Sequence, residues 1–139
     1  MTYNEIEDFN ISGEVIPSDI EVKIIKHHLE PLEQVSNCLG YRVYPSVKSC
    51  YRSKKWELKR GRSGKSQHCF IGLGACDVTC EDFENNKDEL LESLIKQTTY
   101  IRFAVYKTFI HCDYKDTHKG KRLLFNSTSS SKWTFKKFI

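Results

Sequence analysis

Residues 66–77 read SQHCFIGLGACD and carry an imidazole at His68 and a carboxylate at Asp77. Residues 109–113 read FIHCD, and they place His111 inside an apolar run that is typical of a strand. Two imidazoles and one carboxylate, with a fourth position left to water, form the ligand set of a catalytic zinc site. The two stretches therefore predict either a zinc site or, as the alternative, a hydrogen-bonded core histidine beside an exposed aspartate.

Two helices are expected from the spacing of apolar residues. Ser18 and Glu21 form a capping-box pattern, so the first helix should begin there and keep its period up to Gly40. Pro31 removes a backbone donor within it, which predicts one kinked helix or two short ones. A second amphipathic helix is expected over residues 86–97.

Strands are expected over residues 41–50 and 70–78 and in a hairpin formed by residues 101–106 and 109–114. Residues 127–131 are rich in serine and predict a polar loop, after which a last strand should pack through its aromatic residues, Trp133, Phe135 and Phe138. These elements predict an α+β fold, with a small antiparallel sheet and flanking helices.

Length and composition limit the class of protein. The 139 residues suit a single domain, and the 39% of hydrophobic residues excludes collagen-like and wholly disordered chains. The apolar runs fall far short of the roughly 20 residues that a membrane helix needs. Acidic residues stand near the N-terminus (Glu5, Glu7 and Asp8), where a signal peptide would be basic and then apolar, so we expect neither a membrane span nor a signal peptide.

Charge is segregated along the chain. Between residues 48 and 65, eight basic residues stand against one acid, Glu57. This block indicates either an anionic partner or a solvated face. Nucleic acid is not expected, because the block lacks interleaved aromatic residues. The six cysteines, which form no CxxC pair, are expected to be mostly reduced and buried; a cysteine zinc site around Cys76 and Cys80 is the alternative.

Three segments resemble a known family. Residues 47–53 (VKSCYRS) look like its SGYRS segment, residues 66–77 like its SxHxxGxAxD segment, and residues 106–113 like its Y-x-x-F-[VI]-H-x-D segment. The family is that of the D-alanyl-D-alanine carboxypeptidases, zinc peptidases that include peptidoglycan peptidases and bacteriophage endolysins. The resemblance covers about residues 18–133 and implies a hedgehog/DD-peptidase fold for residues 1–139.

The resemblance also implies roles for individual residues. His68, Asp77 and His111 would hold Zn²⁺, and Arg52 would bind a substrate carboxylate or steady a developing oxyanion. Ser66 would be a neighbouring hydrogen-bond partner.

Two departures from the family pattern concern the site. The interval from His68 to Asp77 is longer than in the family, so the extra residues must bulge out. Thr108 occupies the position of the usual general base. Asp113 shares a strand face with His111 and is either the substitute base or a group that orients His111. Tyr106 is either an oxyanion donor or a core residue.

The resemblance implies a zinc-dependent peptidase that cleaves peptidoglycan stem peptides. Without a signal peptide, it would be made in the cytoplasm and act on the cell wall after release, or as a virion component beside other virion proteins. The alternative is a catalytically silent domain of the same fold, serving as a structural or wall-binding module.

Overall fold

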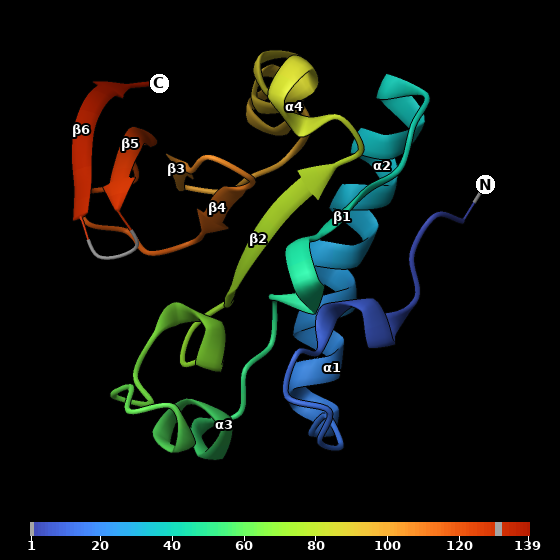
Figure 1. The fold of residues 1–139 in the computed structure, drawn as a ribbon, viewed down its shortest axis with the longest axis vertical. Helices are drawn as coiled ribbons and strands as arrows, with labels where there is room; N and C mark the ends of the chain where they lie inside the picture. Colours follow the sequence, from blue (N-terminus) through green and yellow to red (C-terminus); the bar gives the residue numbers. More distant parts are fainter. Residues whose placement is uncertain (1, 130–131) are drawn as a thin grey trace.

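The computed structural model describes residues 2–129 and 132–139, and its centre is a mixed six-stranded sheet in the order β1-β2-β4-β3-β5-β6 (Figure 1). The strands are β1 (Val43–Pro45), β2 (Ala75–Cys80), β3 (Arg102–Val105), β4 (Ile110–Asp113), β5 (Leu123–Ser129) and β6 (Lys132–Phe138). All neighbouring pairs are antiparallel except β3 and β5, which are parallel. The α+β class is confirmed, and the expected all-antiparallel sheet is corrected: after β4 the chain crosses back to place β5 beside β3.

The helices gather mainly in the first two thirds of the chain. They are α1 (Ser18–Ile24), the π-helical turn η2 (Ile25–Leu29), α2 (Glu30–Leu39), α3 (Lys54–Lys59) and α4 (Phe83–Gln97), with short 3₁₀ turns η1 (Ile6–Phe9), η3 (Ser46–Lys48) and η4 (Gln67–Cys69). The helix expected over residues 86–97 is confirmed as α4, which begins three residues earlier. In the part of the chain that the structure describes, no helix combines the length and apolar character needed to cross a membrane.

The first helix runs continuously through α1, η2 and α2, and the π turn just before Pro31 takes up the irregularity. Proline has no N–H to donate to the carbonyl of His27, and the hydroxyl of Tyr114 donates to that carbonyl instead, at 2.7 Å. The expected capping box is wrong. Ser18 already lies within the helix, Pro17 is the flanking residue, and no side chain caps this end.

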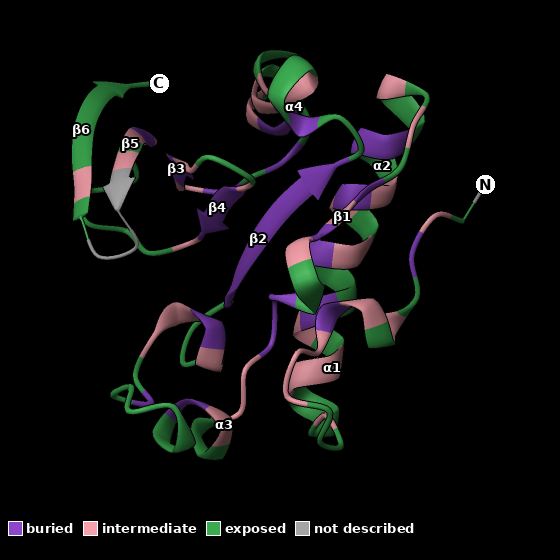
Figure 2. Cartoon of the chain, viewed as in Figure 1, coloured by how far each residue is buried: buried purple, intermediate pink, exposed green. Residues whose placement is uncertain are grey.

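The two faces of the sheet differ. Alternate residues of β2 and β4 point to opposite faces, so Cys76 and Cys112 join the apolar core together with residues of α2 and α4 such as Leu32 and Leu90. β2 and β4 are buried along their whole length (Figure 2). The opposite face carries the polar side chains of the predicted site, Asp77, His111 and Asp113.

Strand boundaries differ from expectation where the backbone enters the left-handed region. The strand expected over residues 41–50 is cut to β1, because Val47 and Lys48 have φ of 46° and 60°. The strand expected from residue 70 begins only at Ala75, because Phe70 is left-handed and Gly74 has φ of 89°. At Gly74 a Cβ would lie 2.4 Å from the ring of Phe70, so no larger residue fits there without a shift.

The C-terminal third is more regular than predicted. The hairpin of β3 and β4 is confirmed. Ser127 and its neighbours up to Ser129 belong to β5 rather than to a loop, because β6 pairs with them; residues 130–131 lie outside the described residues. The last strand is confirmed as β6, but its packing is only partial: Trp133 is half-buried, while Phe135 and Phe138 are each 48% exposed.

Candidate metal centre

Strand register brings two of the predicted ligands together. Asp77 on β2 and His111 on β4 are directly paired across the antiparallel ladder. His68 comes from η4, and the loop that follows it turns outward, with Ile71 and Gly72 exposed, before the chain enters β2. The residues between His68 and Asp77 form this exposed loop, and both side chains reach the same point.

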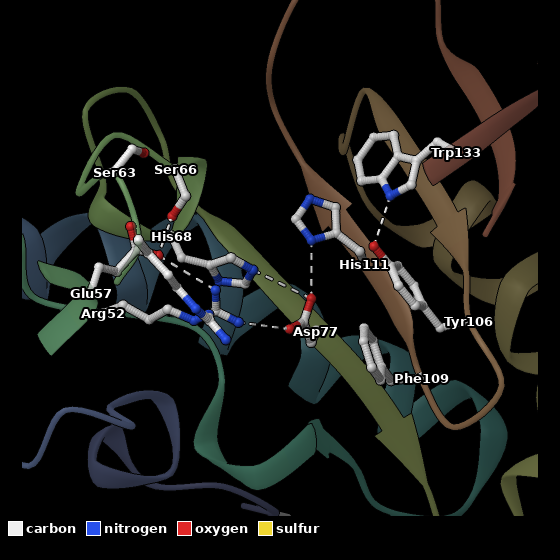
Figure 3. A pocket seen from close by; sticks show the side chains of 11 residues that line it. Arg52, Glu57, Ser63, Ser66, His68, Asp77, Tyr106, Phe109, His111 and Trp133 are labelled. Atoms are coloured by element: carbon white, nitrogen blue, oxygen red, sulfur yellow. Dashed lines mark hydrogen bonds and ion pairs between the residues drawn. The ribbon is translucent and has the colours of Figure 1, made fainter. Parts of the chain in front are cut away.

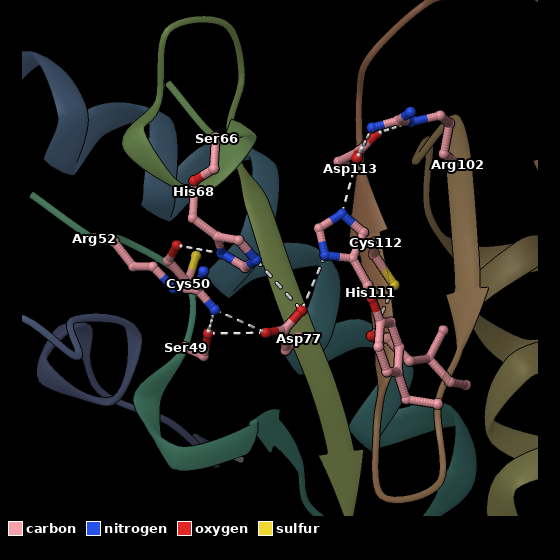
Figure 4. A network of polar contacts seen from close by, with 12 residues as sticks. Ser49, Cys50, Arg52, Ser66, His68, Asp77, Arg102, His111, Cys112 and Asp113 are labelled. Carbon is pink, nitrogen blue, oxygen red and sulfur yellow. Dashed lines mark hydrogen bonds and ion pairs between the residues drawn. The ribbon is translucent and has the colours of Figure 1, made fainter. Parts of the chain in front are cut away.

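The three predicted ligands form one buried group. Asp77 Oδ1 lies 3.0 Å from His111 Nδ1 and 3.4 Å from His68 Nε2 (Figure 4). One ligand atom from each of the three residues lies within 4.8 Å of the other two. Their exposed fractions are 9% or less, so the group is nearly closed off from bulk water.

The outer nitrogen of each imidazole is already held. His68 Nδ1 donates to the backbone carbonyl of Cys50 at 2.9 Å, which leaves Nε2 facing Asp77. His111 Nε2 lies 2.8 Å from Asp113 Oδ2, which leaves Nδ1 facing Asp77. Histidine ligands of metals generally donate their other N–H to a carbonyl or carboxylate in this way, because the contact fixes the ring and its tautomer. The arrangement therefore matches that of a metal-binding pair.

The donor set fits zinc. Four tetrahedral bonds of about 2.0–2.1 Å place neighbouring ligand atoms about 3.3 Å apart. The two distances from Asp77 Oδ1, 3.0 and 3.4 Å, bracket that value. Two imidazole nitrogens and one carboxylate oxygen also leave a fourth position for water or substrate, as catalytic zinc sites do. The residues present could therefore hold a zinc ion.

Charge coupling within the group is strong. Burial by itself would raise the pKa of Asp77, but the charge of His68 and the hydrogen bond to His111 hold it well below its usual range. For His111, burial acts in the opposite direction and lowers the pKa. Hydrogen bonds to Asp113 and Asp77 outweigh this effect and raise the pKa of His111 to about 9. In the metal-free protein a proton therefore sits between His111 and Asp77, at the place where a metal ion would bind.

Arg52 lies beside the same carboxylate. Its Nη2 donates to Ser49 Oγ at 2.8 Å and lies 3.4 Å from Asp77 Oδ2, while Ser49 Oγ donates to that oxygen at 2.9 Å. Its Nε is buried and has no hydrogen-bond partner among the described residues. The structure thus places Arg52 with the metal-binding group.

Glu57 holds the other side of the guanidinium and was missed by the sequence analysis. It is 1% exposed, lies 3.5 Å from Arg52 Nη1, and accepts hydrogen bonds from Ser66 at 2.6 Å and the thiol of Cys69 at 3.2 Å. Burial raises the pKa of Glu57, and the bonds from Ser66, Cys69 and Arg52 outweigh it, so the pKa is lowered overall. Its isolation as the one acid in a basic block was the signal that could have revealed it.

An open cavity of about 670 Å³ lies in front of this group (Figure 3). One wall is polar and comes from the segment around α3 and η4, and the other is aromatic and comes from the β3–β4 hairpin and β6. The lining residues are Arg52, Glu57, Arg62, Ser63, Ser66, His68, Asp77, Tyr106, Phe109, His111 and Trp133. The three candidate ligands lie between these two walls.

Tyr106 reaches the cavity and is held by Trp133. The indole N–H of Trp133 donates to the Tyr106 hydroxyl at 2.7 Å, so the hydroxyl accepts this bond and keeps its own hydrogen to donate. The Trp133 ring also packs on the ring of His111, with centroids 5.1 Å apart. The half-buried Tyr106 is thus a lining residue with a free donor, a role that sequence analysis left open against core packing.

Asp113 lies on the far side of His111 from Asp77. Both of its oxygens are engaged, by Arg102 Nε at 2.8 Å and Nη2 at 2.6 Å and by His111 Nε2, and it is fully buried. Burial raises the pKa of Asp113, but the bonds from His111 and Arg102 lower it to about 2. These contacts favour the orienting role over that of a base. Thr108 is exposed, and its carbonyl accepts a hydrogen bond from Thr79.

A second group of potential ligands lies in the core, formed by His28, Cys50 and Cys76. His28 Nε2 donates to the carbonyl of Leu73 at 2.8 Å, and its Nδ1 accepts from the Tyr100 hydroxyl at 2.7 Å. Burial holds the pKa of the Cys76 thiol well above its usual value. Because both nitrogens of His28 are used and the thiol stays protonated, these contacts favour a packing role. None of the six cysteines is in a disulfide.

No family model, curated protein or solved structure significantly matches this chain. The resemblance to the zinc peptidases therefore rests on the residues of the three segments alone.

Proposed function

We propose that this chain is a zinc-dependent peptidase that cleaves peptidoglycan stem peptides. The observation that carries the proposal is the meeting of His68 Nε2, Asp77 Oδ1 and His111 Nδ1 at the wall of an open cavity. The resemblance to the carboxypeptidase family supplies the substrate class and the hedgehog/DD-peptidase fold. The mixed sheet, with its site on the face opposite α2 and α4, is compatible with that proposal.

Zinc bound by these three ligands would supply Lewis acidity, polarising a peptide carbonyl and lowering the pKa of water. The chain's own residues supply the surroundings. Arg52 places a fixed positive charge beside the ligands, where negative charge develops during attack on the carbonyl. Tyr106 offers a hydroxyl donor from the opposite wall. Asp113 keeps His111 Nδ1 directed at the site.

The place of action follows from the proposed substrate. A peptidase for stem peptides would be made in the cytoplasm and reach the cell wall after release, or as a virion component in contact with other virion proteins. The absence of a membrane-crossing helix among the described residues is compatible with either route.

A catalytically silent module is the second candidate, and one observation favours it. Of the described residues that line the cavity, two carry a carboxylate, Asp77 and Glu57. Asp77 is a proposed ligand, and Glu57 is bonded to Ser66, Cys69 and Arg52. With Thr108 in the position of the usual base, no free carboxylate is evident to accept the proton of an attacking water.

The test combines metal content with product analysis. Wild-type protein should take up one zinc per chain and release muropeptide fragments that mass spectrometry identifies. The zinc affinity of His68→Ala and of His111→Ala should fall further than the ~10–100-fold that is typical when a residue hydrogen-bonded to a metal ligand is lost. His118→Ala, at an exposed histidine outside the site, is the matched control and should keep both properties.

Each outcome decides between the candidates. Full zinc retained by both His68→Ala and His111→Ala would reject the site itself. Zinc bound by the wild type without any muropeptide product, over several peptidoglycan types, would reject the peptidase and support the silent module.

A further inference from the structure

The surface around α3 carries positive charge that nothing in the site uses. Its exposed cations are Lys54, Lys55, Lys59, Arg60, Arg62 and Lys65, which surround the half-buried Trp56; we call this set the α3 basic surface. Figure 2 shows α3 and its following loop as largely exposed. None of these six cations forms an ion pair with the residues that the structure describes.

The one acid of this segment does not neutralise the surface. Glu57 is 1% exposed and turns inward to Arg52, Ser66 and Cys69. Because the charge of Glu57 is paired inside the protein, only the cations of this segment are exposed to solvent. Since Glu57 and Arg52 offset each other, the six exposed cations of the α3 basic surface dominate the potential outside α3.

The cations form a path rather than a single pocket. Arg62 lines the cavity in front of the metal-binding group. Lys55, Lys59 and Arg60 line a second cavity of about 370 Å³, whose other lining residues include Trp56 and one acid, Glu14, which accepts a hydrogen bond from Ser53. Charges spread over two neighbouring cavities suit an extended ligand better than a single small anion.

Trp56 lines the second cavity and contacts both arginines. The guanidinium of Arg60 lies 3.8 Å from the centre of the indole ring, and that of Arg62 lies 5.4 Å from it. Such cation–π contacts hold the planar groups in place while their N–H edges stay available. A guanidinium edge matches the two oxygens of a phosphate or carboxylate.

We propose that the α3 basic surface binds a linear phosphodiester polymer of the cell wall and so holds the cavity against its substrate. Repeated phosphates along a flexible chain match the row of cations that runs from Arg62 through Arg60 to Lys59. Single-stranded nucleic acid is disfavoured, because its unspecific binding uses aromatic rings on which bases stack, and the Trp56 ring already lies against Arg60. The choice of a wall polymer rests on the proposed function; the binding itself does not need catalysis.

The test uses metal-free full-length protein, so it is independent of peptidase activity. Poly(glycerol phosphate) is titrated into the protein in a calorimeter at several salt concentrations. Wild-type protein should bind, with an affinity that falls as salt rises. Arg60→Gln/Arg62→Gln should weaken binding at least tenfold and lower the salt dependence by about two ionic contacts. Both arginines are exposed, and an unchanged melting temperature will confirm that the variant folds.

A matched variant removes the same charge elsewhere. Lys136→Gln/Lys137→Gln on β6 should leave the affinity within about twofold, apart from a small effect of net charge. Equal losses in the two double variants would overturn the proposal in favour of general attraction to a cationic protein. An oligonucleotide with the same number of phosphates that binds as tightly as the polymer would overturn the assignment to the wall. A protein that binds the polymer but cleaves no peptidoglycan would contradict the proposed peptidase function and leave the binding proposal standing.

Discussion

His111 and Asp77 face each other across β4 and β2, with Nδ1 and Oδ1 3.0 Å apart. Their contact is a consequence of strand register, since a slip of one residue would turn either side chain to the other face of the sheet. On the other edge of β4, the register with β3 places Asp113 opposite Arg102. The candidate metal centre and its supporting ion pair are thus fixed by the two ladders that β4 forms with β2 and β3.

Asp113→Asn tests the orienting role. The amide keeps the shape of the side chain but loses the charge that holds His111 Nε2, so zinc affinity should fall about 10–100-fold. Titration with a competing zinc chelator measures this. A base would behave otherwise: zinc affinity would be unchanged while turnover fell about 10²–10⁴-fold.

Arg102→Met tests the ion pair behind the site. Asp113 is fully buried and receives two hydrogen bonds from Arg102, so the substitution leaves a buried charge with one partner fewer. We expect the free energy of unfolding to fall by about 3–5 kcal/mol. Lys96→Met is the control, because Lys96 pairs with Glu92 in solvent on the surface of α4, where the loss should be small. Urea denaturation of both variants decides the matter, and similar small losses would contradict the prediction.

The candidate metal ligands were predictable because each stands out in its own short segment of sequence. His111 stands in an apolar strand, and His68 and Asp77 bracket one short segment. The hairpin that carries His111 also follows from local periodicity. What could not be predicted is the set of partners that come from distant parts of the chain: Ser49 for Asp77, and Trp133 on β6 for Tyr106.

The errors in the fold have the same origin. The capping-box pattern at Ser18 is correct in composition, but Ser18 is the first residue of the helix and Pro17 takes the flanking position. Ser127 lies in a polar run that suggests a loop, yet pairing with β6 makes it part of β5. In both places the structure follows the neighbouring backbone rather than the local sequence preference. The sequence pattern does not describe those backbone contacts.

Arg52→Lys tests the geometry of the guanidinium. Lysine keeps the charge but cannot contact Ser49 and Glu57 from one planar group, so kcat/KM for muropeptides should fall at least tenfold. Arg42→Lys makes the same exchange away from the cavity and should have no effect on the reaction. If the two variants cleave equally well, the role of Arg52 in the site is wrong.

Tyr106→Phe tests the donor on the aromatic wall. The phenyl ring keeps the packing but removes the hydroxyl, so kcat should fall about 10²-fold with little change in KM, as for loss of a hydrogen bond made in the transition state. Tyr44→Phe, at a tyrosine that does not line the cavity in front of the metal-binding group, is the control. A rise in KM at constant kcat would instead assign Tyr106 to substrate binding.

The stability of the fold should depend on pH through His28. This residue is buried against the rings of Phe70, Tyr100 and Tyr114, and burial lowers its pKa from 6.5 to about 3. Between these values the unfolded chain binds a proton that the folded chain does not, so stability is lost as the pH falls from 6.5 towards 3.

Urea unfolding between pH 6.5 and pH 4.5 tests this effect by comparing wild-type protein with His28→Gln, because the lowered pKa values of His27 and Glu57 add the same slope in both proteins. The free energy of unfolding should fall by up to about 1.4 kcal/mol per pH unit in wild-type protein. The raised pKa of His111 adds no slope there, because its stabilisation is already complete below pH 6.5, and the lowered pKa of Asp77 acts mainly below pH 4. His28→Gln, which is less stable at neutral pH but does not titrate, should lose most of the slope. An equal slope in wild type and His28→Gln would show that His28 is protonated in the folded protein, with its Nδ1 donating to the Tyr100 hydroxyl rather than accepting from it.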